Sequence, residues 1–256
     1  MKKAVLIAFC CIFIMCSGTI IGIATAGNAA YSLIECGCVA PATIDGKWTA
    51  LDEWTDSYRC PLSFNGVFGY DIDFSTYGIE WVIEPFFDST NNAGDIAQIC
   101  IDELNDGASS PQTDDTKIEI TGHTTCKLYK GTGTAWTEVA ATEILWSNTV
   151  TTSPWGGVDH WVIEIKDPDK QVGNLVTGAP PNGMRVAYYD AATDRWSDWA
   201  PSGNANTPSS WGLVSGYSMD PVPEGFSIIF VAVLSTMAIV VAFGLKKRAS
   251  LPKQLR

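Results

Sequence analysis

Lysine and arginine are scarce through the middle of this 256-residue chain. Seven of the 16 cations lie within the first three and the last eleven residues. Residues 27–222 hold nine cations against 27 acidic residues, a net charge of −18. A surface that binds nucleic acid needs cations to face the phosphates, so this deficit argues against a nucleic-acid partner.

The chain also has few of the residues on which enzyme active sites depend. It contains two histidines, His123 and His160, and it has no HExxH, GxSxG, phosphate-binding loop or dinucleotide-binding fingerprint. Carboxylate pairs that could hydrolyse glycosides arise by chance among so many acidic residues. We therefore predict that the protein is not an enzyme and carries no organic cofactor.

Long apolar runs occur only at the two ends. Residues 1–30 join Lys2 and Lys3 to an apolar run and to small residues at 24–26 and 28–30, which is typical of a secretory signal peptide. An uncleaved anchor is the alternative, because apolar residues continue to position 26. Residues 226–244 carry no charge, and a helix of that length nearly spans a hydrocarbon core of ~30 Å. The basic residues 246–248 place the tail 245–256 in the cytoplasm, so we expect an exported protein displayed on the cell surface.

A short motif stands in the linker 219–225, directly before the apolar segment. Pro223, Glu224, Gly225 and Phe226 precede the span and its basic tail. This order resembles the sorting tails read by archaeosortases and exosortases, in which a Pro-Glu-Phe or Pro-Gly-Phe signature precedes one helix. The resemblance implies cleavage and lipid attachment by a sortase-like enzyme. The motif departs from both short forms because it holds Glu and Gly together, so simple membrane spanning stays open.

The central part, residues 31–218, shows short runs in which apolar and polar residues alternate. Such runs occur at 79–84, 97–102, 117–121, 160–166 and 184–189. A period of two with one apolar face is typical of a half-buried antiparallel strand. Turn-forming residues separate the runs, as in Pro180 to Gly183, and no long amphipathic helix is found. The pattern predicts an all-β domain in which two sheets form an antiparallel sandwich.

The start of this domain carries a recognisable pattern. Ile44, Asp45 and Gly46 form a predicted turn, and an acidic residue followed by Trp54 comes several residues later. This opening resembles family nine carbohydrate-binding modules and the related DOMON-like domains, and stretches at 101–107, 159–165 and 183–187 are similar to the same group. The resemblance implies a jelly-roll-like antiparallel sandwich over roughly residues 42–215 that binds glycans or small ligands.

All ten tryptophans lie in the central domain. Sugar rings stack their C–H faces on aromatic rings while nearby carboxylates and amides bind their hydroxyls. We assign Trp48, Trp54, Trp81 and Trp161 to the core. The stretch 194–218 is rich in Gly, Pro, Ser and Asn, which favours a loop with exposed side chains. The predicted ligand-binding residues are Trp196, Trp199, Trp211, Arg195 and Asp198.

An acidic loop at 102–107 suggests a metal site. Calcium takes six to eight oxygen ligands from a flexible loop. Leu104 and Thr113 occupy positions where an EF-hand needs oxygen ligands, so this is not an EF-hand. A calcium site at the edge of the sandwich is predicted instead, with the ligands Asp102, Asn105, Asp106 and Asp114.

Five cysteines lie outside the signal region, and export allows them to oxidise. They permit at most two disulfides in 15 arrangements, with Cys100 and Cys126 placed to link neighbouring strands. A cell that lives without oxygen would keep them reduced, and a zinc site is disfavoured because no histidine is close in sequence. The disulfide candidates are Cys36, Cys38, Cys60, Cys100 and Cys126.

These observations favour a non-catalytic module, displayed on the cell surface, that binds polysaccharide or a cell-envelope glycan and holds structural calcium. One alternative is a structural envelope or sheath protein with no small ligand. A second alternative follows from the DOMON-like resemblance, because some of those domains hold haem between a methionine and a histidine. Met184 and His160 are the residues of that kind in this chain.

Overall fold

The computed structural model describes residues 27–34, 41–73, 78–168, 181–201 and 203–215. Cys36, Cys38, the sorting motif 223–226, the predicted span 226–244 and the tail 245–256 lie outside the described residues, as does all of the predicted signal peptide before Gly27. None of the helices in the described part combines the length and the apolar character that crossing a membrane requires.

The described residues form a fold of short strands. They contain thirteen strands and a single 3₁₀ turn, η1 (Pro208–Ser210). The strands are β1 (Asn28–Ile34), β2 (Tyr58–Pro61), β3 (Gly66–Asp73), β4 (Gly78–Pro85), β5 (Ile96–Asp102), β6 (Asp115–Thr121), β7 (Thr125–Gly131), β8 (Trp136–Val139), β9 (Leu145–Thr151), β10 (His160–Asp167), β11 (Asn182–Asp190), β12 (Arg195–Trp199) and β13 (Gly212–Ser215).

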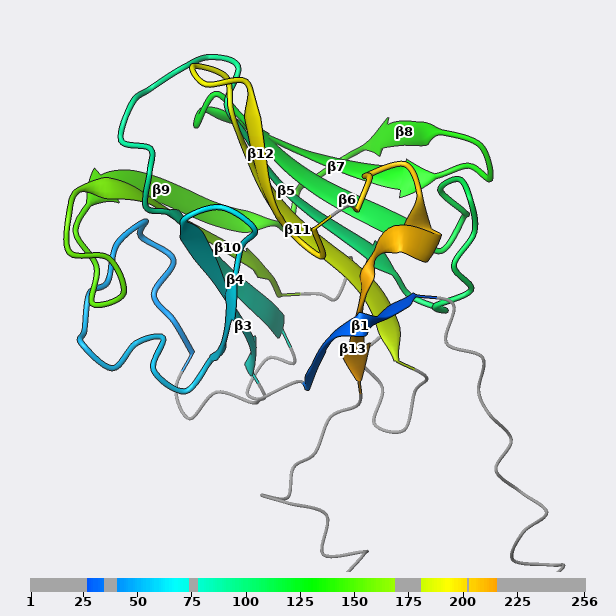
Figure 1. Ribbon diagram of the computed structural model, residues 1–256, viewed down its shortest axis with the longest axis horizontal. Coiled ribbons are helices and arrows are strands. Elements are labelled where there is room, and N and C mark those ends of the chain that lie inside the picture. Colours follow the sequence, from blue (N-terminus) through cyan, green and yellow to red (C-terminus); the bar gives the residue numbers. More distant parts are fainter. Residues whose placement is uncertain (1–26, 35–40, 74–77, 169–180, 202, 216–256) are drawn as a thin grey trace, which may run out of the picture.

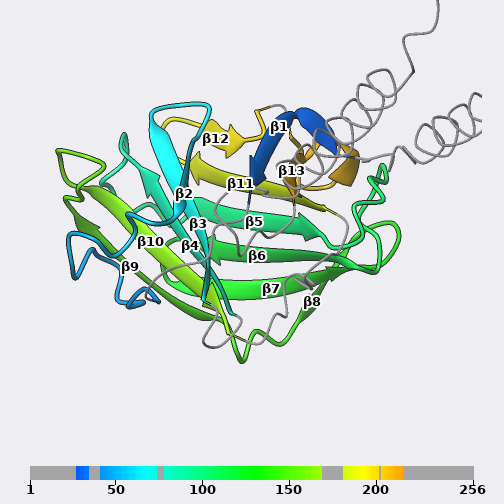
Figure 2. The ribbon, with the colours of Figure 1, turned by 90° about the horizontal axis from the view of Figure 1, so that it is seen from below.

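Two sheets pack face to face as a sandwich (Figures 1 and 2). The larger sheet has eight strands in the order β1-β13-β11-β5-β6-β7-β8, with β12 paired to the second half of β11. The smaller sheet has the order β2-β3-β4-β10-β9. Every pairing is antiparallel except β1 with β13, which brings the two ends of the domain together at one edge. The prediction of an all-β sandwich of two sheets is confirmed.

The alternating runs of the sequence lie in five of these strands. The runs at 79–84, 97–102, 117–121, 160–166 and 184–189 fall within β4, β5, β6, β10 and β11. Their apolar positions point into the space between the sheets, where Ile83, Ile99, Ile118, Ile163 and Val186 are buried. Burial of one such side chain contributes about 1.5–3 kcal/mol, so this core supplies the main driving force for folding.

The three central strands of the smaller sheet are buried on both faces. Every residue of β3, β4 and β10 is buried, because the segment 41–57 lies over the outer face. Trp54 packs there with Val82 and Val162, and Trp48 and Trp155 complete the cluster. Trp54, Trp81 and Trp161 are buried in hydrophobic clusters as predicted, Trp81 and Trp161 in the main core and Trp54 beneath the outer segment. Trp48 is only partly buried against the second cluster.

Three of the five disulfide candidates lie among the described residues, and none of these three forms a disulfide there. Cys60, Cys100 and Cys126 are free thiols. Cys100 and Cys126 lie on strands separated by β6, and they face opposite ways. Cys126 packs against the core, whereas the Sγ of Cys100 lies 3.9 Å from Gln98 Oε1 on the outer face. Burial raises the pKa of Cys60 to about 12 and of the other two to about 11, so all three stay protonated.

Candidate functional site

A pocket of about 360 Å³ opens on the outer face of the larger sheet. Its floor comes from side chains of neighbouring strands, namely Gln98 on β5, Arg185 on β11, and Trp196 and Asp198 on β12. The loop 203–206 forms its wall. These four side chains occupy outward positions because the inward positions of the same strands fill the core.

Trp196 is the exposed aromatic residue of this pocket, with 41% of its surface accessible. Its ring lies 5.0 Å from the ring of Tyr189, centre to centre, and 5.1 Å from the guanidinium carbon of Arg185. The Arg185 guanidinium and the tilted Tyr189 ring therefore hold the indole in place, while about two fifths of the residue's surface stays accessible. Such a surface suits stacking against an apolar face of a ligand.

Arg185 organises the polar part of the pocket. Its Nη1 donates to Gln98 Oε1 at 2.6 Å, and its Nη2 lies 3.4 Å from Asp198 Oδ2. The Nε donates to the carbonyl of Gly203 at 3.1 Å. The buried cation therefore joins β5, β12 and the loop, and these bonds hold the polar groups in fixed positions.

Two tryptophans fix the remaining part of the loop. Trp211 Nε1 donates to the carbonyl of Asn204 at 2.8 Å, and Trp136 Nε1 donates to Asn206 Oδ1 at 3.0 Å. The two indole rings stack with an angle of 5° between their planes. Trp136 on β8 and Trp211, directly after η1, therefore hold the loop 203–206 in place, so the wall of the pocket is preformed.

The same outer face carries a further row of polar and aromatic residues. Glu119 accepts hydrogen bonds from Gln98 Nε2 and Lys117 Nζ, both at 2.9 Å. The Lys117 ammonium lies 4.1 Å from the centre of the Tyr129 ring and 5.6 Å from that of Trp136. No sequence motif singles out these residues, and their outward positions in alternating strands are the signal that could have identified them.

The structure brings together two of the five predicted ligand-binding residues, Trp196 and Asp198. Trp199 faces the core, is 6% exposed and packs against Phe68 at 5.5 Å between ring centres. Trp211 is fully buried beneath the loop. The Arg195 guanidinium lies over Phe64, away from the pocket. Burial therefore keeps Trp199 and Trp211 from contacting a ligand in this fold. Arg195 is exposed but lies outside the pocket, since alternation along β12 turns Arg195 and Trp199 to the face opposite Trp196.

The acidic loop also gathers carboxylates, although the set differs from the predicted one. One oxygen each from Asp102, Asp114 and Asp115 lies within 4.8 Å of the others. Asp115 begins β6 directly opposite Asp102, the last residue of β5. Its Oδ1 is buried and has no hydrogen-bond partner among the described residues. Burial and the neighbouring carboxylates raise the pKa of Asp115 to about 8.

The other two predicted calcium ligands lie differently. Asp106 is exposed, and it reaches the cluster through its backbone N–H, which donates to Asp102 Oδ1 at 3.3 Å. Asn105 is buried in a left-handed conformation with φ of 49°, and it is not part of the carboxylate group. Asp115 takes their place, because the pairing of two strand ends adds a ligand that loop spacing alone does not reveal.

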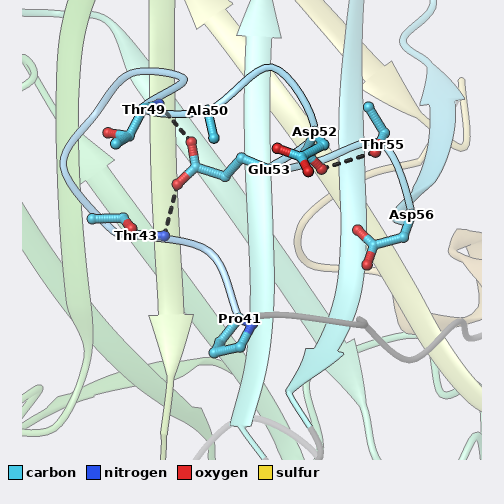
Figure 3. A pocket seen from close by; sticks show the side chains of 8 residues that line it. All are labelled: Pro41, Thr43, Thr49, Ala50, Asp52, Glu53, Thr55 and Asp56. Atoms are coloured by element: carbon cyan, nitrogen blue, oxygen red, sulfur yellow. Dashed lines mark hydrogen bonds between the residues drawn. The ribbon is translucent and has the colours of Figure 1, made fainter.

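The Ile44-Asp45-Gly46 turn has a structural part in the fold. The backbone N–H groups of Asp45 and Gly46 donate to Glu164 Oε2 at 2.9 and 2.7 Å, and Trp54 Nε1 donates to the other oxygen at 3.0 Å. A second pocket lies on this segment (Figure 3), where Glu53 accepts from the backbone N–H groups of Thr43 and Thr49. Because backbone N–H groups and the Trp54 indole already satisfy the Glu164 carboxylate, the turn attaches the segment 41–57 to the smaller sheet.

The two residues considered for haem do not form a pair. Met184 points into the core between the sheets. His160 lies at a position of β10 that faces the opposite way, with its ring nitrogens 2.7 Å from the carbonyl of Val158 and 3.1 Å from Glu84 Oε2. A haem needs both axial ligands on one cavity, and this arrangement does not provide it.

No family model matches the sequence, and no curated protein matches it. Two solved structures are similar. One is a carbohydrate binding module of family 9 from Caldicellulosiruptor kristjanssonii in complex with glucose, with a TM-score of 0.49 and 17% identity over 75% of this chain and 100% of that chain. The other is the module in complex with cellotriose, with a TM-score of 0.48 and 15% identity over 75% of this chain and 97% of that chain.

Proposed function

We propose that this protein is a non-catalytic binding module whose ligand is a polysaccharide or a cell-envelope glycan, taken up in the pocket around Trp196. The observation that carries the proposal is an exposed indole beside a preformed set of hydrogen-bonding groups. The ring offers a stacking surface, while Asp198, Gln98 and Asn206 offer acceptors and donors for hydroxyl groups.

The charge balance of the pocket favours a neutral sugar. The cation of Arg185 is already paired with Asp198 and bonded to Gln98. An acidic sugar would have to displace Asp198 in a domain that carries a large excess of negative charge. A neutral hexose or pentose unit needs only hydroxyl partners, and the pocket supplies them.

The test compares two aromatic truncations in the purified protein, kept in a detergent without a sugar head group. Soluble neutral β-glucans, xylans and mannans are titrated by calorimetry alongside one polyuronate. We expect Trp196→Ala to weaken binding tenfold or more, about 1.4 kcal/mol. The control is Phe64→Ala. Phe64 lies in the β2–β3 turn, against the face of β12 opposite Trp196, and its exposure is similar at 38%, so this variant should leave the affinity unchanged. Equal affinity of Trp196→Ala and the parent protein, or no binding to any glycan, would remove the proposal.

Calcium bound by Asp102, Asp114 and Asp115 is the second part of the proposal. Two strand ends present their carboxylates to one point, and the unpartnered Asp115 Oδ1 supports an oxygen-liganded cation there. The ion would neutralise the cluster and stabilise the turn 103–114. Backbone carbonyls and water would complete the six to eight ligands.

Removal of calcium by a chelator is expected to lower the melting temperature. Calcium at 100 times its Kd stabilises by about 2.7 kcal/mol, which corresponds to roughly 5–10 °C for a domain of this size. Asp115→Asn should abolish the calcium-dependent difference, whereas Asp52→Asn, at an exposed position on the segment 41–57, should keep it. A parent protein that melts at the same temperature with and without calcium would contradict the proposed site.

Display on the outer cell surface completes the proposal. Its support is the sequence of the two ends, with the span 226–244 or its lipid-linked product as the anchor. Strand β1 starts at Asn28, so removal of a signal peptide after Ala26 leaves this strand whole. Mass measurement of the mature protein from membranes tests both ends, since sortase-like processing near 223–226 removes the basic tail. An intact mass that retains both ends would contradict signal cleavage and tail processing alike.

A further inference from the structure

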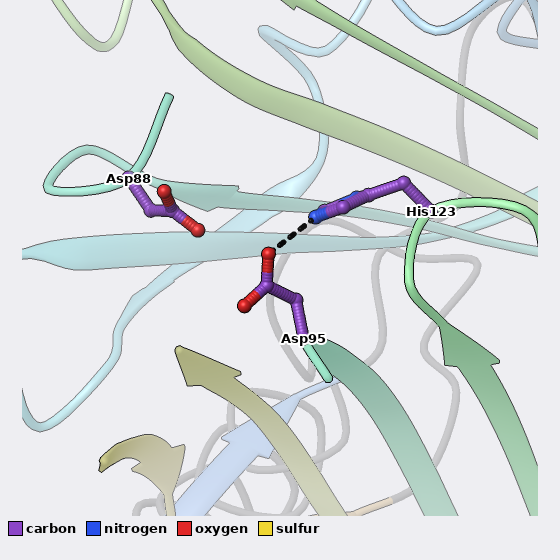
Figure 4. Close-up of side chains that lie close together, drawn as sticks. All are labelled: Asp88, Asp95 and His123. Atoms are coloured by element: carbon purple, nitrogen blue, oxygen red, sulfur yellow. Dashed lines mark hydrogen bonds and ion pairs between the residues drawn. The ribbon is translucent and has the colours of Figure 1, made fainter. Parts of the chain in front are cut away.

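A second cluster of metal-binding side chains lies at the end of the sandwich formed by the β4–β5 connection and the β6–β7 turn. Asp88 and Asp95 lie near the two ends of this connection, and His123 lies in the turn. One donor atom from each lies within 4.8 Å of the others, and Figure 4 shows the two carboxylates and the imidazole pointing toward one another. All three residues are buried.

The donor set distinguishes this cluster from the calcium site. Calcium is bound by oxygen ligands, whereas an imidazole with carboxylates is a set that zinc and other first-row transition metals accept. The Nε2 of His123 lies 3.2 Å from Asp95 Oδ2. Two ligands of a tetrahedral zinc ion with bonds of ~2.0–2.1 Å lie about 3.3–3.4 Å apart, so this pair already has the required spacing.

Hydrogen bonds from the surrounding chain orient the carboxylates. Asp88 Oδ1 accepts from the backbone N–H and the hydroxyl of Thr90, at 2.8 and 2.7 Å, which leaves Oδ2 for the centre of the cluster. Asp95 Oδ1 accepts from the N–H of Ala191 at 2.9 Å. The Tyr188 hydroxyl lies at this centre, where it donates to Asp88 Oδ2 at 2.6 Å and lies 3.1 Å from His123 Nε2. Outer contacts of this kind fix first ligands in protein metal sites.

The position of His123 is equally determined. Its backbone has φ of 57°, in the left-handed region, and its ring stacks on Trp161 at 3.6 Å between centres and 9° between planes. The Nδ1 has no hydrogen-bond partner among the described residues. Nδ1 can therefore carry the imidazole proton when Nε2 binds a metal ion.

The charges of the site also favour a cation. Two buried carboxylates face each other, and no lysine or arginine of the described residues forms an ion pair with either. Buried charges need a partner, because desolvation is costly. From this geometry we infer that Asp88, Asp95 and His123 bind one divalent transition-metal ion of the zinc class, with Tyr188 as a positioning residue hydrogen-bonded to Asp88.

The test uses the full chain, stripped of metal with a chelator and titrated with zinc chloride in a calorimeter. We expect one site, and His123→Gln should weaken zinc binding by more than about 100-fold, since even the loss of an outer contact costs 10–100-fold. Asp52→Asn is the control, because it removes an exposed carboxylate that belongs to neither cluster and should retain zinc binding. Equal zinc affinity of His123→Gln and the parent protein would overturn the inference.

Two further measurements keep the result clear if His123→Gln fails to fold. Asp88→Asn changes a different ligand and should also lose zinc. Cobalt(II) replaces zinc in the parent protein, and coordination by one nitrogen and oxygens in a four-coordinate site should give intense visible absorption bands. A parent protein that takes up no zinc, or whose cobalt spectrum equals that of the hydrated ion, would dispose of the site.

Discussion

Buried acidic side chains are the residues whose properties this fold alters most. Burial raises the pKa of Glu164 to about 7, although the N–H groups of Gly46 and Asp45 and the indole of Trp54 oppose the rise. Burial likewise raises the pKa of Asp71 to about 8. Between about pH 5 and the raised pKa, each of these carboxyl groups therefore favours its protonated form in the folded protein more than in the unfolded chain.

The first residue-scale prediction concerns pH. The folded pKa of Asp71 exceeds its ordinary value of 3.8, so its contribution to stability is fully present below pH ~4 and declines as the pH rises to ~8. Asp71→Asn cannot ionise. As the pH rises from 4.5 to 8, the free energy of unfolding of the variant should therefore increase by about 1–3 kcal/mol relative to that of the parent protein. This figure takes 1.36 kcal/mol per pKa unit and reduces the total because solvent screens the charge.

Urea unfolding at several pH values measures this difference. The exposed Asp52→Asn serves as control and should follow the parent protein at every pH. A constant difference between Asp71→Asn and the parent protein from pH 4.5 to 8 would show that Asp71 ionises normally in the fold.

The second residue-scale prediction concerns Gly46. Its φ is 82°, and a Cβ built there would lie 2.7 Å from backbone atoms of Asn148. Gly46→Ala should therefore detach the turn from Glu164 and destabilise the domain by about 2–4 kcal/mol. Gly157→Ala, where nothing lies within 4 Å, should change the unfolding midpoint little. Similar midpoints for both variants would contradict the fastening role of the turn.

At the scale of elements, β12 joins the two sheets. Ser197 Oγ donates to the carbonyl of Phe64 at 2.6 Å and accepts from its N–H at 3.0 Å, and the backbone N–H of Ser63 donates to the carbonyl of Asp198 at 3.0 Å. The β2–β3 turn is thus held against the strand that carries Trp196. Within the larger sheet β12 pairs with only β11, so these hydrogen bonds are a second attachment of this strand to the domain.

The element-scale prediction is that Ser197→Ala frees this turn. Loss of a buried hydroxyl that both donates and accepts leaves two backbone groups unpaired, which costs about 1–3 kcal/mol. Amide exchange should accelerate at Phe64 while the amides of β6 keep their protection. Unchanged exchange at Phe64 would show that the turn does not need Ser197.

At the scale of the whole molecule, the excess of acidic residues acts on every part of the domain. Nine cations face 27 acidic residues between positions 27 and 222, so like charges repel across the surface. Salt screens such repulsion, with a Debye length of about 10 Å at 0.1 M. The melting temperature should therefore rise by a few degrees between about 0.01 and 0.5 M sodium chloride, measured with calcium held constant. A melting temperature that falls over this range would mean that attractive ion pairs dominate.

The sequence determined the fold class and the run of strands, because alternation with a period of two is a local property that a single stretch of chain displays. Runs such as 79–84 and 184–189 identified β4 and β11 directly. It also pointed to Trp196 and Asp198 through their turn-rich surroundings, which are local too, although the residues 195–199 form β12 and not the predicted loop. It does not reveal that Glu80, Glu84 and Glu164 are buried, because their cover comes from a segment far away in the chain.

Tertiary structure alone decided which side chains meet. Asp115 joins Asp102 through the pairing of β6 with β5, and His123 reaches Asp88 and Asp95 from a separate turn. Arg185 gains its partners from β5, β12 and a loop, while Trp199, two positions from Ser197 on β12, turns to the core. Sheet order and register set these contacts, and both arise from packing between distant segments that local patterns do not contain.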